Sequence, residues 1–232
     1  DGEFSSGDYA YPYPAIVNSI GENTFYGNPT GNFLTCTTAG SGSLDLLNAP
    51  AVYTSSTLAI EVNEGQSVED INLILVPEFE AIDLAVDLIS LDPNRPGFDA
   101  TYLLNLQNIG TICEQSGELT LNFPEYVEII ASESSQLDFS GNEATMDMIE
   151  LCPFESLEFE IEVTIDDTVS LGTILEAAVE AISSETDANP VDNTFTSVVE
   201  VVGSYDPNDK QVSATTIGDE FLDDGSPLKY TI

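Results

Sequence analysis

The chain has 232 residues with 42 Asp and Glu, 3 Lys and Arg and no His, which gives a formal charge of -39 at neutral pH. Nucleic acid and anionic membranes bind to clustered Lys and Arg, and this chain offers only Arg95, Lys210 and Lys229, so its composition argues against both partners. We expect no membrane insertion, because apolar stretches such as 71–77 are far shorter than the ~18 residues that a membrane span needs. Without His, the chain also lacks Ser-His-Asp and Cys-His catalysis and the common zinc ligand sets.

Alternating apolar and polar residues predict β-strands along most of the chain. In 157–165, Leu157, Phe159 and Ile161 fall on one face and glutamates fall on the other, as in a half-buried antiparallel strand. A helix is an alternative for 174–182, whose Ala and Glu content suits both structures. The pattern predicts an all-β sandwich fold. The predicted strands are 56–62, 71–76, 82–91, 101–109, 117–123, 127–131, 145–151, 157–165, 173–183 and 194–202.

Two turn-rich seams, at 76–80 and 203–210, divide the chain into three predicted segments. The segments are 1–77, 78–203 and 204–232, and the middle one holds 27 of the 42 carboxylates. Its length of about 125 residues suits a single β-sandwich domain. We interpret 204–232 as a linker and the start of a further β-domain. We also expect the chain to be an internal piece of a longer protein, because it ends on the start of an alternating strand.

Short strings of turn and polar residues adjoin several predicted strands. They are 95–98 (Arg-Pro-Gly-Phe), 108–111 (Asn-Ile-Gly-Thr), 169–173 (Val-Ser-Leu-Gly-Thr), 187–195 (Asp-Ala-Asn-Pro-Val-Asp-Asn-Thr-Phe) and 202–210 (Val-Gly-Ser-Tyr-Asp-Pro-Asn-Asp-Lys). Through these strings the chain from residue 82 onward resembles a repeat-type, immunoglobulin-like domain of very large secreted Bacteroidetes proteins, many of which leave by type IX secretion. In such proteins the last string opens a further β-domain. The resemblance implies an extracellular or cell-surface location.

The first residues carry a second resemblance. Asp1-Gly2-Glu3-Phe4-Ser5-Ser6-Gly7-Asp8 precedes a Pro-rich entry to 15–17. This opening is similar to that of a B-type domain of the serine-aspartate-repeat or collagen-adhesin kind, a small transthyretin-like β-sandwich. The resemblance implies that 1–77 is such a sandwich without its first strand. Taken together, the chain is expected to be a tandem of transthyretin-like and immunoglobulin-like β-sandwiches.

Three acidic loops are candidate sites for a hard cation, because carboxylate and amide oxygens are the ligands that calcium prefers. For each loop the alternative is a turn in which Asp and Asn side chains bond to the backbone without a metal. The loop at 206–209 is preferred, since an ion at that seam would fix the orientation of two modules. The candidate ligands are Asp1 and Asp8; Asp187, Asp192 and Asn193; and Asp206, Asn208 and Asp209, with Ca²⁺ as the candidate cofactor.

The three cysteines divide into a candidate pair and a single residue. In an immunoglobulin-like sandwich, the connections that contain Cys113 and Cys152 lie at the same end, so the two side chains are placed to form a disulfide. Such a bridge encloses about 38 residues, and an extracellular location favours its oxidation. The alternative is two small buried thiols. Cys36 has no evident partner and is predicted to be a core residue.

No motif in the sequence requires chemistry, so we expect the chain not to be an enzyme. The first hypothesis is a non-catalytic extracellular structural or adhesion module of a large secreted or cell-surface bacterial protein, acting as a β-sandwich spacer that calcium stiffens. Its partners are expected to be other domains of the same polypeptide, with a surface glycan or protein as a further candidate. The second hypothesis is an accessory module, glycan-binding or spacer, of a secreted polysaccharide-degrading enzyme. A carboxylate-based hydrolase is the least favoured alternative.

Overall fold

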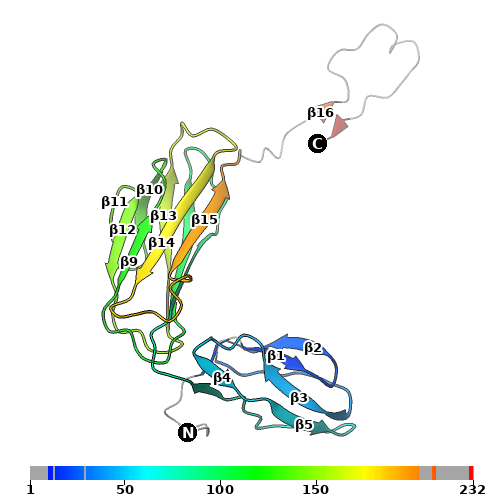
Figure 1. The fold of residues 1–232 in the computed structure, drawn as a ribbon. Helices are drawn as coiled ribbons and strands as arrows, with labels where there is room; N and C mark the ends of the chain where they lie inside the picture. Colours follow the sequence, from blue (N-terminus) through cyan, green and yellow to red (C-terminus); the bar gives the residue numbers. More distant parts are fainter. Residues whose placement is uncertain (1–9, 13, 29, 204–210, 213–229, 232) are drawn as a thin grey trace, which may run out of the picture.

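The computed structural model describes residues 10–12, 14–28, 30–203, 211–212 and 230–231. The described residues form antiparallel strands joined by turns and contain no α-helix, which confirms the all-β prediction (Figure 1). Consistent with this, none of the described residues belongs to a helix of the length and hydrophobicity that a membrane crossing needs.

The N-terminal unit is built on a four-stranded sheet in the order β2-β1-β3-β5. Its strands are β1 (Ala15–Asn18), β2 (Asn23–Tyr26), β3 (Gly40–Leu46) and β5 (Leu58–Val62). Two short strands, β4 (Tyr53–Ser55) and β6 (Leu75–Pro77), pair with each other beside it. Among its described residues, the buried hydrophobic side chains are Ala15, Ile16, Leu44 and Val52. This unit therefore has a small core.

The second unit is a sandwich of two sheets that share one large core. One sheet has the order β10-β13-β8-β7 and the other the order β11-β12-β9-β14-β15. A single hydrophobic cluster between them includes residues of both sheets, and Tyr102 packs edge-on against Phe123 with ring centroids 5.0 Å apart. The strands are β7 (Leu84–Ser90), β8 (Asp99–Asn108), β9 (Glu118–Asn122), β10 (Val127–Ser132), β11 (Asp138–Ser140), β12 (Glu143–Asp147), β13 (Ser156–Ile165), β14 (Ile174–Ile182) and β15 (Thr194–Glu200). Beyond the sandwich, β16 (Gln211–Val212) pairs with β17 (Tyr230–Thr231).

Alternation in the sequence sets which face of each strand is buried. In β13 the apolar residues Phe159, Ile161, Val163 and Ile165 are buried, and the intervening glutamates are exposed. The helix alternative for 174–182 is wrong. These residues form β14, which pairs with β9 on one side and with β15 on the other, and its small apolar residues face the core at every second position.

The structure also corrects several predicted elements. Of the segment predicted as 71–76, only residues 75 and 76 are in a strand, as part of β6 (Leu75–Pro77). The strand predicted at 145–151 lies at Glu143–Asp147. Strands β1 to β4 and the short β11 were not predicted. Strand β3 has the sequence Gly-Ser-Gly-Ser-Leu-Asp-Leu, which lacks the apolar alternation of a strand, so its pairing with β1 and β5 depends on backbone hydrogen bonds.

Cys36 is a second correction. The sequence predicted a core residue, but Cys36 is a free and exposed thiol. It lies between β2 and β3 in a segment without assigned strand. Burial alternates along this segment: Phe33 and Thr35 are half-buried, whereas Leu34 and Cys36 are exposed, so Cys36 lies on the outward side.

Candidate functional site

Three carboxylates meet where the second unit begins. Asp83 directly precedes β7, and Asp187 and Asp192 lie in the loop between β14 and β15. One carboxylate oxygen from each residue lies within 4.8 Å of one from each of the others. Asp83 is only 1% exposed, and the other two are half-buried. We call these three residues the acidic cluster.

Backbone hydrogen bonds hold the loop against the start of β7. The Leu84 N–H donates to Asp187 Oδ2 at 2.8 Å, and the Val86 N–H donates to the Asp192 carbonyl at 3.0 Å. Within the loop, the Asn189 N–H donates to Asp187 Oδ1 at 2.9 Å, which is an Asp turn. The Asn189 amide donates to Asp192 Oδ2 at 2.7 Å. The positions of all three carboxylates thus follow from local turn chemistry and from the pairing of this loop with β7.

Several oxygens at this place have no hydrogen-bond partner among the described residues. They are Oδ1 of Asp83, Oδ1 of Asp192 and Oδ1 of the buried Asn193 next to it. Burial, together with the charges of Asp192 and Asp187, raises the pKa of Asp83 to about 6. Burial likewise raises the pKa of Asp192. The hydrogen-bond donors around the acidic cluster therefore leave several of its oxygens without a partner.

The described residues supply no cation to this cluster. Arg95 is the only Lys or Arg among them. It follows β7, whereas Asp83 precedes it, so the seven-residue strand Leu84–Ser90 separates the two. Carboxylate oxygens crowded in this way suit a hard cation such as Ca²⁺, which takes six to eight oxygen ligands.

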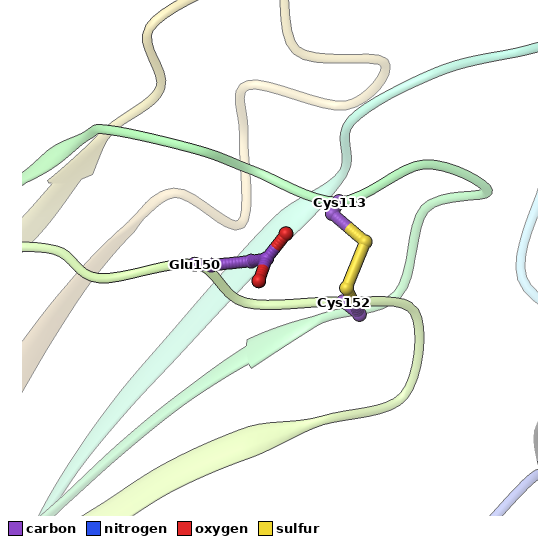
Figure 2. Close-up of side chains that lie close together, drawn as sticks. All are labelled: Cys113, Glu150 and Cys152. Carbon is purple, nitrogen blue, oxygen red and sulfur yellow. A yellow bond between two sulfur atoms is a disulfide. The ribbon is translucent and has the colours of Figure 1, made fainter.

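A disulfide closes the same end of the sandwich. Cys113 and Cys152 are bonded to each other, and the carboxylate of Glu150 lies beside them (Figure 2). The oxygen of Glu150 and the two sulfurs lie within 4.8 Å of one another. Both sulfurs are used in the disulfide, so this group has no thiolate to offer a metal. The loop is further fixed by Asn108, whose buried amide donates to the carbonyls of Ile112 and Leu151, both at 2.8 Å.

The residue after Cys113 is a buried carboxylate with many donors. Glu114 is fully buried, and its Oε1 accepts the N–H groups of Gln115 and Ser116 at 2.9 and 3.0 Å. Its Oε2 accepts the Ser183 hydroxyl at 2.6 Å and the Ser184 N–H at 3.0 Å, and the Ser184 hydroxyl donates to Oε1. Burial opposes ionisation, but these hydrogen bonds outweigh it and lower the pKa of Glu114. Glu114 therefore joins the loop after β8 to the end of β14.

An aromatic contact joins the two units at this end. The Phe154 ring lies 5.3 Å from the Tyr53 ring and 5.0 Å from the Tyr11 ring, measured between centroids. The Tyr53 hydroxyl donates to the Gly110 carbonyl at 2.5 Å. Phe154 has a φ of +63°, a left-handed conformation that is unfavourable for a bulky residue. Strained residues of this kind persist where the surrounding structure holds them, often at functional contacts. We call Tyr11, Tyr53, Gly110 and Phe154 the junction.

The linker between the units is also held by hydrogen bonds. The Glu78 N–H donates to the Val52 carbonyl at 3.0 Å, which ties the start of the linker to the N-terminal unit. Ala81 and Thr111 exchange two bonds of 2.8 Å, one in each direction, and the Ile109 N–H donates to the Asp83 carbonyl at 2.7 Å. The linker thus runs along the loop after β8 and has little freedom to swing.

Gly110 is required by this close approach. A Cβ atom at this position would lie 2.5 Å from the Ala81 carbonyl oxygen and 2.6 Å from the Asp83 nitrogen, both backbone atoms. Gly110→Ala is therefore expected to push the linker away and to reduce the free energy of unfolding by about 1–3 kcal/mol. Chemical denaturation measures this loss. Gly203→Ala is the control, because its nearest contact would be an ordinary 3.4 Å to a Leu171 methyl group; equal losses in both variants would contradict the steric argument.

The structure brings together only part of the predicted ligand set. Asp187 and Asp192 lie in the acidic cluster, and Asn193 adjoins it with one unpartnered oxygen. The other candidates, Asp1, Asp8, Asp206, Asn208 and Asp209, lie outside the described residues. The sequence interpretation missed Asp83. A signal was present, because Asp83 stands between Ile82 and Leu84 in an apolar run, where a carboxylate is unexpected unless it has a partner.

No protein-family model matches the chain, and no curated protein matches it. Solved β-sandwich structures are similar to it. A crystal structure of the CARDB domain of a Pyrococcus furiosus protein, in complex with di-metal ions, is 19% identical, covers 54% of this chain and 98% of its own, and gives a TM-score of 0.41. The sixth cohesin of Acetivibrio cellulolyticus scaffoldin B is 12% identical, covers 52% of this chain and 99% of its own, and gives a TM-score of 0.37. The major pilin subunit of Bacillus cereus is 12% identical, covers 84% of this chain and 65% of its own, and gives a TM-score of 0.43.

Proposed function

We propose that the chain is a non-catalytic structural or adhesion module of a large secreted or cell-surface bacterial protein, in which the tandem β-units act as a stiff spacer. As a spacer, the module would hold other domains of the same polypeptide at a fixed distance from one another. The resemblance of 82–232 to repeat domains of secreted Bacteroidetes proteins supports this assignment, including export by type IX secretion.

The observation that carries the proposal is the fixed connection between the two units. Three elements contribute to it: the aromatic contact of Phe154 with Tyr53 and Tyr11, the Tyr53 hydroxyl bond to Gly110, and the hydrogen bonds of the linker. Independent domains on a free linker move relative to each other by default. A linker that is bonded along its length instead transmits orientation from one unit to the next, as a spacer requires.

Two further features support an extracellular location for the module. The disulfide between Cys113 and Cys152 is typical of proteins that fold in an oxidising compartment. Calcium is the cofactor that we propose for the module, with the acidic cluster as the part of the described chain that offers it carboxylate oxygens.

An accessory role in a polysaccharide-degrading enzyme is the second candidate. A glycan-binding face would display a row of exposed Tyr or Phe side chains on one sheet. Within the described part of the chain, the exposed aromatic residues lie on separate elements: Tyr26 in β2, Phe79 in the linker, Phe98 before β8, Tyr126 before β10, Phe139 in β11 and Phe195 in β15. This distribution favours a spacer over a glycan platform.

The spacer function is tested by measuring the distance between the units. Nitroxide labels on Ser41→Cys in β3 and Glu176→Cys in β14, both exposed, report that distance by electron double resonance in a Cys36→Ser background. The spacer predicts a single narrow distance distribution. Phe154→Ala removes two ring contacts, each worth about 0.5–1.5 kcal/mol beyond burial, so the distribution is expected to widen.

Phe98→Ala serves as the matched control for this measurement. Phe98 is an exposed phenylalanine just before β8, whereas the junction lies beyond the other end of that strand. Its replacement is expected to leave the distance distribution unchanged. A distribution that is already broad in the unsubstituted protein would overturn the spacer function.

A further inference from the structure

We propose that Asp83, Asp187 and Asp192 form a binding site for a hard divalent cation of the calcium class, and that the bound ion locks the start of β7 to the loop between β14 and β15. Binding itself is independent of the spacer function. Only its mechanical consequence, a stiffer junction, rests on that function.

The spacing of the three carboxylates fits such an ion. Calcium binds oxygen at about 2.3–2.6 Å, so two ligands on opposite sides of it lie at most roughly 5 Å apart. The three carboxylate oxygens lie within 4.8 Å of one another. A point between oxygens spaced in this way is at most about 2.8 Å from each of them, slightly more than a calcium–oxygen bond, so small side-chain rotations would complete the contacts. Second carboxylate oxygens and water can fill the remaining positions.

An independent observation is that the buried Asp83 carboxylate has an oxygen without a hydrogen-bond partner. This side chain is 1% exposed, yet its Oδ1 has no hydrogen-bond partner among the described residues. A buried carboxylate without a partner is costly, and buried charges in proteins are normally paired or bound to metal. Two further carboxylates face it, and the described residues place no Lys or Arg beside it. A cation from solution is the remaining source of neutralising charge.

The ligand chemistry selects the class of ion. All three residues offer carboxylate oxygen, and the cluster contains no thiolate or imidazole. Magnesium needs near-ideal octahedral geometry at 2.0–2.1 Å, whereas calcium accepts irregular shells at longer distances. A cluster whose ligands come from both the start of a strand and a turn suits the more tolerant ion.

The position of the site connects it to the junction. The Asp83 carbonyl accepts the Ile109 N–H at 2.7 Å, and the next residue, Gly110, accepts the Tyr53 hydroxyl. An ion that fixes Asp83 therefore also fixes the loop that Tyr53 contacts. Occupancy of the site is expected to narrow the distance distribution between the two units.

The experiment titrates CaCl₂ into the full chain after chelator treatment, with binding followed by calorimetry and stability by thermal unfolding. Extracellular calcium modules bind with a Kd of about 10⁻⁴–10⁻³ M. At 100 times the Kd, calcium is expected to raise the Tm by roughly 5–10 °C. Asp83→Asn and Asp192→Asn are each expected to abolish this shift. The ion-free Asp83→Asn protein is expected to melt above the ion-free parent, because a buried negative charge is removed.

Asp87→Asn is the matched control, because Asp87 lies on the same strand β7 with an exposed side chain. This variant is expected to keep the full calcium response. The site is refuted if calcium leaves the Tm of the parent unchanged, or shifts Asp83→Asn as much as the parent. If this happens while the distance distribution between the two units is narrow without calcium, the cation site is refuted and the spacer function is not. The two proposals can therefore be tested separately.

Discussion

Replacing both Cys113 and Cys152 by serine is expected to reduce the free energy of unfolding by about 3–4 kcal/mol. The disulfide closes a loop with a sequence separation of 39, and the loop entropy that it removes from the unfolded chain accounts for this amount. The Tm is expected to fall by about 10 °C. Chemical denaturation under oxidising conditions measures the difference between the variant and the parent.

Two controls make this result specific. Cys36→Ser removes a free, exposed thiol and is expected to leave stability unchanged. A reductant is expected to lower the stability of the parent to that of the double variant, with no effect on the double variant itself. Equal stability of parent and double variant would show that the bridge does not constrain the unfolded chain.

Glu114→Gln is expected to reduce the free energy of unfolding by about 2–4 kcal/mol. Five donor groups from Gln115, Ser116, Ser183 and Ser184 point at the Glu114 carboxylate. An amide keeps one acceptor oxygen but turns an NH₂ group toward the donors at the other position. Hydrogen bonds to a charged group contribute about 1.5–3 kcal/mol each, and a buried donor without a partner adds its own penalty.

Acid titration gives this substitution a distinct signature. Because the pKa of Glu114 is lowered in the folded protein, its ionisation stabilises the fold above the unfolded pKa near 4.3, and this contribution is lost as the pH falls through the folded value. The difference in stability between parent and Glu114→Gln should therefore shrink below pH ~4. Glu118→Gln replaces an exposed glutamate four residues later and is the control, because its side chain is exposed and its replacement is expected to change stability little. A difference that stays constant down to the lowest measurable pH would contradict the assigned role of the charge.

The sequence predicted the second unit better than the first. In β13 apolar and polar residues alternate, so the period alone indicated the strand and its buried face. In β14 neighbouring apolar residues interrupt the alternation, which is why the sequence also allowed a helix there. Strand β3 has no such pattern because two glycines and two serines precede its leucines. Its place in the sheet depends on backbone pairing with β1 and β5, which is a long-range property that no local window contains.

The candidate site also has one part that the sequence predicted and one part that it did not. Asp187 and Asp192 were identified because both stand in one polar loop, where the residue types themselves suggest ligands. Asp83 is about a hundred residues away in sequence, and only the pairing of β7 with that loop places it beside them. Cys36 was predicted to be a core residue because it had no evident partner, but a thiol without a partner need not be buried, and Cys36 lies on the outward side of its segment.

The disulfide also determines how this module behaves under tension. A pulling force enters the second unit through the linker, follows β7 and β8 to Cys113, crosses the bridge and leaves through Cys152 and β13. Strands β9 to β12 lie between the two cysteines, so the bridge keeps this part of the chain from being stretched once the unit unfolds. The bridge spans a sequence separation of 39, and an extended chain measures about 3.4 Å per residue. The bridged protein is therefore expected to lengthen by roughly 130 Å less than the reduced protein when the sandwich unfolds. In the proposed spacer role, the bridge would thus limit how much a single unfolding event lengthens the module.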